Sequence, residues 1–214
     1  MSRNQKIIFS FIILFIGIFI FASEYFKSKK IEVYDYMNEL YYNKVVEIDE
    51  EVDEIEDNEE NNQDDGVEDT GYKFDNSLSD MVYIGYLRIP NINFKKGFTE
   101  KNSKYNNVNR NIQILSSSDY PDKENGNVII AGHSGNSSVS YFNKLYLLNI
   151  GDLAYIDYNN VTYTYKIINI YNIEKTGKAE IKTLKDKSTL TLITCTKDNK
   201  TSQTIYTLEL ISKE

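Results

Sequence analysis

The chain has a single cysteine, Cys195, and a single histidine, His133. A thiol and an imidazole are the smallest pair of groups that supports covalent acyl transfer. Each residue has a plainer explanation when taken alone, because free cysteines are often small buried hydrophobes and single histidines are common in surface loops. Cys195, however, ends a β-type segment at residues 189–195, and His133 directly follows another at residues 128–131 and Gly132. A thiolate needs a nearby base or cation at neutral pH, so together they predict a nucleophile and its acid–base partner.

Membrane insertion is predicted by the N-terminal end of the sequence. Arg3 and Lys6 precede an apolar run at residues 7–22, and three lysines follow the run by residue 30. The run of sixteen residues is shorter than the ~20 of a typical spanning helix and just above the ~15 of a secretory signal. No A-x-A pattern marks a cleavage site, so we interpret residues 1–30 as an uncleaved signal anchor with its flanks, and a cleavable signal peptide is the alternative. Basic residues on both sides leave the orientation open.

The strong negative charge is confined to one part of the chain. Residues 47–69 hold fourteen Asp or Glu and no Lys or Arg, whereas residues 70–214 hold fourteen acidic and eighteen basic residues, a net charge of +4. A segment as charged as residues 47–69 cannot bury a core and stays extended, which indicates a spacer. Apolar residues recur every three or four positions from residue 31 to residue 46, as they do in a helix. We therefore expect a juxtamembrane helix and an acidic linker at residues 31–71.

From residue 72 onward the sequence is typical of a β protein. Short segments rich in Val, Ile, Thr and Tyr are separated by Asn, Asp, Gly and Ser, and Asn159-Asn160 is expected to form a hairpin turn. Eight strands in this stretch fit a mostly β fold, one closed or nearly closed barrel with short helices. The strands are expected at residues 83–89, 92–98, 112–115, 128–131, 153–158, 161–173, 189–194 and 204–211, and a short helix at residues 141–148.

No sequence motif predicts a cofactor. There is no CxxC metal cluster, no glycine-rich phosphate loop and no basic-aromatic patch for nucleic acid, so we expect neither a cofactor nor a nucleic-acid partner. Acidic residues in the second half of the chain include types that bind calcium, but a solvated loop is the better interpretation. These residues are Asp119, Asp122 and Glu124, together with Glu174 or Glu180.

The two motifs around His133 and Cys195 resemble those of the sortases, the membrane-anchored cysteine transpeptidases of Gram-positive bacteria. Residues 191–195 read Thr-Leu-Ile-Thr-Cys, which is similar to the Thr-Leu-x-Thr-Cys signature of that family, and residues 131–135 are similar to its histidine loop. Residues 85–92 and 141–152 also resemble sortase elements. The resemblance extends over about residues 80–212 and includes the order and spacing of the histidine and the cysteine.

The resemblance implies an eight-stranded sortase-type β-barrel at residues 72–214, preceded by an N-terminal transmembrane helix and lying outside the cell on a single-pass membrane anchor. Sortases cleave an LPxTG-type sorting signal on a surface protein, form a thioacyl enzyme, and pass the acyl group to an amine of a peptidoglycan precursor or a pilin. In that scheme Cys195 is the nucleophile, and His133 is the general acid that protonates the leaving amine. The implied partners are sorting-signal proteins, the amine acceptor, and the membrane through residues 7–22.

One residue of the family pattern is missing. Sortases carry an arginine on the strand after the cysteine, which helps to hold the substrate and the developing oxyanion, yet no arginine follows Cys195 here. The β pattern places Gln203 at the expected position, with Thr204 as the neighbouring choice. A glutamine amide donates a hydrogen bond but carries no charge. Other cations remain alternative sources of the charge: Lys197, Lys200, Arg88 and Arg110.

The missing arginine leaves two hypotheses about function. The first is an active sortase with Cys195, His133 and Gln203 in its site; the second is a catalytically weak or inactive sortase-like module that binds a wall polypeptide. Retention of both Cys195 and His133 favours the enzyme. The short stretch at residues 174–187 and the absence of tryptophan favour a class D-like or compact class B-like sortase over a pilin-type enzyme with a lid.

Overall fold

The structure is a computed structural model, and it describes residues 3–52, 81–176, 181 and 184–214. The chain divides into two compact units, Met1–Met37 and Asn38–Glu214. A single helix, α1 (Arg3–Val52), covers both the predicted anchor and the predicted juxtamembrane helix. No helix among the described residues is both long enough and apolar enough to cross a membrane, so the expected transmembrane helix is not supported. The predicted linker beyond residue 52 lies outside the described residues.

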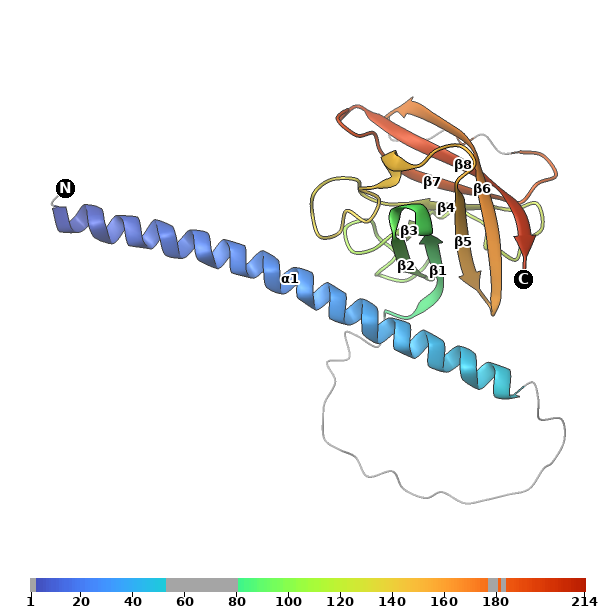
Figure 1. The fold of residues 1–214 in the computed structure, drawn as a ribbon, viewed down its shortest axis with the longest axis horizontal. Helices are drawn as coiled ribbons and strands as arrows, with labels where there is room; N and C mark the ends of the chain where they lie inside the picture. The colour runs from blue at the N-terminus through green and yellow to red at the C-terminus, as the bar shows by residue number, and fades with distance from the viewer. Residues whose placement is uncertain (1–2, 53–80, 177–180, 182–183) are drawn as a thin grey trace, which may run out of the picture. The chain divides into compact units, whose positions relative to one another are not determined.

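The second unit contains an eight-stranded, nearly closed β-barrel, which confirms the mostly β fold (Figure 1). Hydrogen-bonded neighbours follow the order β2-β1-β5-β6-β8-β7-β4-β3, and the two end strands, β2 and β3, approach each other. All the paired strands are antiparallel except β4 and β7, which run parallel. The strands are β1 (Tyr83–Ile89), β2 (Phe94–Thr99), β3 (Gln113–Ile114), β4 (Asn127–Ala131), β5 (Leu153–Tyr158), β6 (Val161–Glu174), β7 (Thr189–Cys195) and β8 (Ser202–Lys213).

Alternation along the strands explains how the barrel is filled. In β6, Tyr163, Tyr165 and Ile167 point into the core while the residues between them are more exposed, which is the period of two that a half-buried strand requires. The turn before β6 is the predicted hairpin: Asn159 and Asn160 have φ of 49° and 57°. Two successive residues with positive φ are the signature of a type I′ turn, whose twist matches that of the flanking strands.

Strand β7 is buried on both faces. Leu190 and Leu192 contribute to the main core inside the barrel, whereas Ile193 packs with Ile129 and Ile205 in a second, smaller cluster on the opposite face of the sheet. Adjacent residues of a strand point to opposite faces, so Cys195 lies on the same face as Ile193 and the small cluster. The thiol therefore faces away from the main core.

The short helix predicted at residues 141–148 is confirmed only in part. Only a single 3-10 turn, η2 (Leu145–Leu147), forms there, held by bonds from Leu145 N–H to Phe142 O and from Leu148 N–H to Leu145 O. Phe142, Leu145 and Leu148 are buried, and this spacing of three matches the three residues per turn of a 3-10 helix better than the 3.6 of an α-helix. A second 3-10 turn, η1 (Pro90–Ile92), follows β1.

Candidate active site

The parallel pairing of β4 and β7 brings the two chemically interesting residues together. Parallel strands end at the same edge of a sheet, and here Ala131 of β4 is in register with Ile193 of β7. Cys195 is the last residue of β7, and His133 comes two residues after the end of β4. Residues 62 positions apart in the sequence therefore line one cleft.

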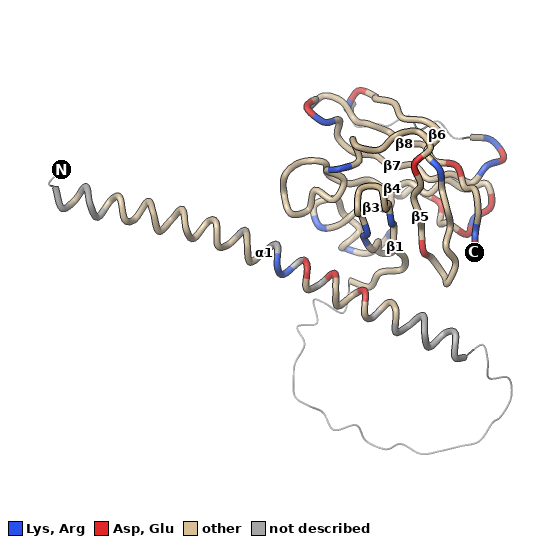
Figure 2. The backbone as a smooth tube through the Cα atoms, in the orientation of Figure 1, with Lys and Arg blue, Asp and Glu red and all other residues tan. Residues whose placement is uncertain are grey.

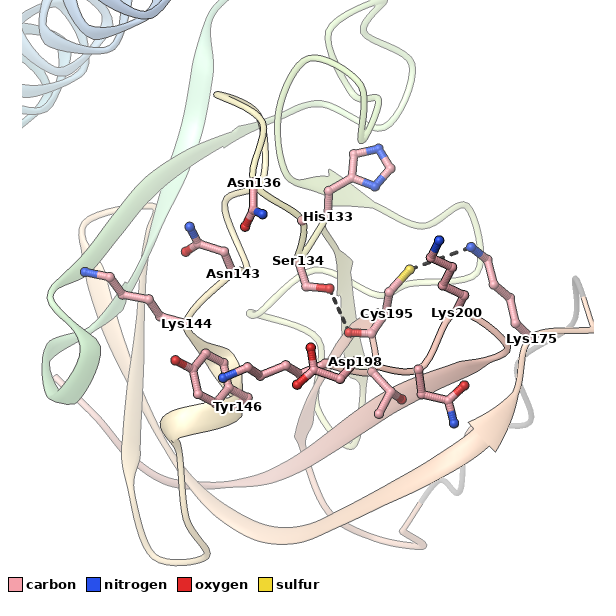
Figure 3. Close-up of a pocket in the computed structure, with 14 residues that line it drawn as sticks. His133, Ser134, Asn136, Asn143, Lys144, Tyr146, Lys175, Cys195, Asp198 and Lys200 are labelled. Carbon is pink, nitrogen blue, oxygen red and sulfur yellow. Dashed lines mark hydrogen bonds between the residues drawn. The ribbon is translucent and has the colours of Figure 1, made fainter.

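Three hydrogen bonds extend the strand pairing beyond the end of β4. The N–H of Gly132 donates to Ile193 O (3.1 Å), Thr194 Oγ1 donates to Gly132 O (2.8 Å), and Ser134 Oγ donates to Cys195 O (2.7 Å). The last of these bonds is drawn in Figure 3. Gly132 and Ser134, alternate residues of the histidine loop, are thus hydrogen-bonded to β7. The loop cannot shift along this strand without breaking these bonds.

Close packing fixes the other side of the histidine loop. A methyl group on Gly132 would lie 2.8 Å from Cδ2 of Phe142, so no larger residue fits unless the ring moves. The N–H of Phe142 donates to His133 O at 2.9 Å. Because Gly132 has no side chain, the buried Phe142 ring packs directly against the backbone of the histidine loop and supports it.

Cys195 and His133 open into a cleft of about 990 Å³ (Figure 3). Its walls come from the histidine loop, the segment around η2, the end of β6 and the turn between β7 and β8. Four lysines and one carboxylate line it, which makes the cleft electropositive. These charged residues are Lys144, Lys175, Lys197, Lys200 and Asp198.

The His133 ring is held by an asparagine. Its Nε2 lies 3.0 Å from Asn109 Oδ1, so in this arrangement the ring nitrogen donates to the amide oxygen. The recorded partner of His133 is thus Asn109 rather than the thiol of Cys195. The sequence offered no signal for Asn109, because its contact depends on the fold of the segment between β2 and β3.

Gln203, the residue that the β pattern aligned with the family arginine, lies opposite Cys195 on β8. The two residues are Cα partners in the antiparallel β7–β8 pair, and directly paired residues place their side chains on the same face. The Gln203 side chain is half-buried, and it is not among the described residues that line the cleft. Thr204 is buried, and its hydroxyl binds Asn172 Oδ1 (2.9 Å) and Thr196 Oγ1 (3.0 Å). Thr204 is therefore engaged in holding strands together.

Arg88 and Arg110, the two arginines considered as alternative sources of the charge, lie outside the cleft. Arg88 forms a two-pronged ion pair with Asp157, at 2.5 and 2.7 Å. Burial alone would raise the pKa of Asp157, but hydrogen bonds from Arg88 and Thr162 hold that pKa below its usual value. The Arg110 guanidinium stacks 5.7 Å from the centre of the Tyr105 ring. Neither arginine lines the cleft.

Lysines supply the charge of the cleft. Lys197 Nζ lies 3.6 Å from the centre of the Tyr146 ring, a cation–π contact, and Lys200 lines the cleft. Lys175 was not among the predicted residues, yet its Nζ is a hydrogen-bond donor to Cys195 Sγ at 3.7 Å. The sequence places Lys175 twenty residues before the cysteine. Only the pairing of β6 with β8 reveals their proximity.

Asp119, in the loop before β4, is hydrogen-bonded within that loop and to the first residue of β4. Asp119 accepts hydrogen bonds from Lys123 Nζ (2.5 Å) and from the N–H of Asn127 (3.0 Å), and the Lys123 bond is the main reason that the pKa of Asp119 is lowered. Within the ranges that the structure describes, no group of three His, Cys, Asp or Glu is placed to hold a metal. Glu180, one of the calcium candidates, lies outside those ranges.

The eight-stranded barrel is of the sortase type, and the comparisons agree. The sortase family, described as Sortase domain, matches residues 87–211. The chain therefore belongs to the sortase family. No curated protein matches.

Solved sortase structures share the fold at low sequence identity. The chain is similar to sortase C1 of Streptococcus agalactiae, with 23% identity and a TM-score of 0.54 over 68% of this chain and 79% of that one. It is similar to sortase C of Streptococcus pneumoniae, with 21% identity and a TM-score of 0.54 over 61% of this chain and 67% of that one. For sortase C-1 of Actinomyces oris the identity is 20% and the TM-score 0.54, over 61% and 74% of the two chains. These likenesses show the fold.

Replacement of Thr194 by valine tests whether the strand bonds hold the histidine loop. Thr194→Val removes the bond to Gly132 O, and Thr191→Val, the matched control, removes a buried bond from Thr191 to Asn127 Oδ1. Each change should lower the free energy of unfolding by about 1 kcal/mol. Only Thr194→Val should speed hydrogen exchange in peptides covering residues 131–142. Equal exchange in both variants would contradict this role for the Thr194 bond.

Proposed function

We propose that this chain is an active sortase that cleaves an LPxTG-like sorting signal through a thioacyl intermediate on Cys195. The observation that carries the proposal is the shared cleft, in which a free thiol and an imidazole stand at the ends of two paired strands. Partly buried apolar side chains, Ala131, Tyr171 and Ile173, pack against the small cluster on the face that carries the thiol. These apolar side chains are suited to pack against the leucine and proline of an LPxTG-like signal.

The proposed reaction has two balanced halves. The Cys195 thiolate attacks the scissile carbonyl carbon, a carbon–sulfur bond forms, and the carbonyl electrons move to the oxygen. When the oxyanion collapses, the carbon–nitrogen bond breaks and His133 gives a proton to the leaving amine. An acceptor amine then attacks the thioester, loses a proton to the neutral imidazole, and the thiolate leaves. His133 must turn from Asn109 toward the leaving amine for this transfer.

The acceptor is proposed to be an amine of a peptidoglycan precursor or of a pilin. Family membership supports an amine acceptor, and the S. pneumoniae sortase C structure is described in terms of pilin substrate specificity. The electropositive cleft favours substrates with acidic groups near the reacting bond, because four lysines outnumber one carboxylate there. A binding module without turnover is the alternative, and it follows from the absence of the family arginine.

Residues 7–22 are proposed to hold the chain on the cell membrane, with the barrel outside. Residues 7–23 carry no Asp, Glu, Lys or Arg, and Figure 2 shows an uncharged stretch along α1. The described side chains from Phe9 to Phe21 are mostly large, apolar and exposed, and a helix apolar on all sides needs an apolar environment. The full chain should stay with membranes after alkaline carbonate washing and be cut by external protease in intact cells. Release by carbonate, or protection from protease, would contradict the proposal.

Loss of the thiol should abolish activity. With the full chain and a sorting-signal peptide, Cys195→Ala should show no cleavage, and His133→Ala should cleave about 10²–10⁴ times more slowly because the general acid is gone. Product formation is followed by chromatography, and thermal melting checks that both variants are folded. Peptide cleavage by Cys195→Ala would contradict the mechanism. A folded wild-type chain that binds sorting signals but never cleaves them would favour the binding module.

Gln203 is proposed to donate its amide N–H to the oxyanion. Gln203→Ala should then lower the rate of acylation by about tenfold, less than the 10²–10³ typical when an oxyanion donor is lost outright. Gln203→Arg should hold or raise the rate, since a charge-assisted donor replaces a neutral one. Single-turnover acylation measures both. An unchanged rate in Gln203→Ala would remove Gln203 from the site.

A further inference from the structure

The contact between Lys175 and Cys195 is held in place by the sheet. Ile173, Gln203 and Cys195 lie in one row across β6, β8 and β7, since each is a Cα partner of the next. Lys175 follows Ile173 by two residues, so it lies on the same face, one step further along. Its N–H donates to Thr201 O at 2.7 Å, which continues the β6–β8 pairing past the end of β6. The backbone that carries the ammonium is thus fixed beside the thiol.

The side chain of Lys175 points across the cleft toward the sulfur. Figure 3 shows Lys175 reaching Cys195, with a dashed line from Nζ to Sγ that corresponds to 3.7 Å. An ammonium donates hydrogen bonds and cannot accept them, so the sulfur is the acceptor in this contact. A thiolate accepts such a bond better than a thiol does, because the bond is then between opposite charges.

Among the cations considered for this site, Lys175 is the one that contacts the sulfur of Cys195. Lys197 sits over the Tyr146 ring, Arg88 pairs with Asp157, and Arg110 lies over the Tyr105 ring. Gln203 is opposite the cysteine but carries no charge. The residue just past the end of β6, one strand beyond β8, thus brings a positive charge to the sulfur.

We propose that Lys175 is a catalytic residue, the cation that holds Cys195 as a thiolate and then follows the negative charge to the oxyanion. The thiol proton passes to His133 or to solvent, and Lys175 keeps its own proton throughout. When the thiolate attacks, charge moves from Sγ to the carbonyl oxygen two bonds away, within reach of an ammonium on a flexible four-carbon stem. The first part rests on geometry alone, and the second part rests on the proposed function.

Alkylation of the full chain by iodoacetamide tests the first part without any substrate. Cys195 is the only cysteine, so the measured rate belongs to it. At pH 7 and low salt, Lys175→Met should react about tenfold more slowly than the wild type, because an opposite charge within about 4–6 Å strongly favours a thiolate. Lys175→Arg should restore most of the rate. At pH 10, where an ordinary thiol is ionised, wild type and Lys175→Met should react alike.

Control variants separate the contact from the general field. Lys166→Met removes an equal charge from an exposed position on β6 outside the cleft and should leave the alkylation rate unchanged. Lys200→Met removes a charge that lines the cleft and should slow the reaction by less than Lys175→Met does. Equal rates for wild type and Lys175→Met at pH 7 would overturn the inference, as would equal losses for Lys175→Met and Lys200→Met. Thermal melting of Lys175→Met and of a second variant, Lys175→Gln, excludes misfolding.

Single-turnover acylation with a sorting-signal peptide tests the second part. At pH 7 the loss of acylation rate in Lys175→Met should exceed its loss of alkylation rate by at least tenfold, because the oxyanion loses its cation as well as the thiolate. If Lys175→Met alkylates and acylates as the wild type does, the inference fails while the proposed function stands. If the wild type never acylates but alkylation still depends on Lys175, the proposed function fails while the thiolate contact stands.

Discussion

The parallel pairing of β4 with β7 is the constraint on which the site depends. It aligns the C-terminal ends of two strands that are far apart in the sequence, so that the histidine loop and the cysteine emerge at one edge. Bonds from Gly132, Thr194 and Ser134 continue that alignment past the last paired residue of β4. Because β7 is buried on both faces, its end is a rigid support for the Cys195 thiol.

The strands beside β7 decide which groups face the thiol. β8 pairs with β7 and β6 pairs with β8, so the same edge of the sheet receives side chains from three consecutive neighbours in space. A positive charge can reach the sulfur from any of them, provided that the residue lies on the face that carries Cys195. In this chain β8 offers the amide of Gln203, and the end of β6 offers the ammonium of Lys175. A neutral residue on β8, such as Gln203, is thus compatible with a positive charge beside the sulfur, because the end of the neighbouring strand β6 supplies that charge.

Local sequence signals predicted most of the barrel. The alternation along β6 and the Asn159-Asn160 pair mark a strand and its hairpin turn directly, because side-chain direction and positive φ are local properties. The helix predicted at residues 141–148 is reduced to the 3-10 turn η2, because apolar residues at a spacing of three, which fit a 3-10 turn best, also lie on one face of an α-helix. Periodicity over eight residues is too short to distinguish them.

The candidate site could be predicted only in part, because some of its contacts join segments that are distant in the sequence. Cys195, His133 and the position of Gln203 follow from motifs and from the β pattern of one strand. Asn109 and Lys175 reach the site through contacts between segments distant in the sequence, and no local pattern encodes those contacts. Lys175 in particular depends on where the β6–β8 pairing ends, which a sequence alone does not specify.

In the proposed function, the thiol at the end of β7 becomes acylated by a sorting signal. Intact-mass spectrometry of the full chain, quenched within seconds of mixing with an LPxTG-type peptide, tests it most directly. We expect a mass increase equal to the acyl fragment, removed by hydroxylamine and located on Cys195 by fragmentation. Cleavage of the peptide with no covalent adduct, or an adduct on any other residue, would contradict it.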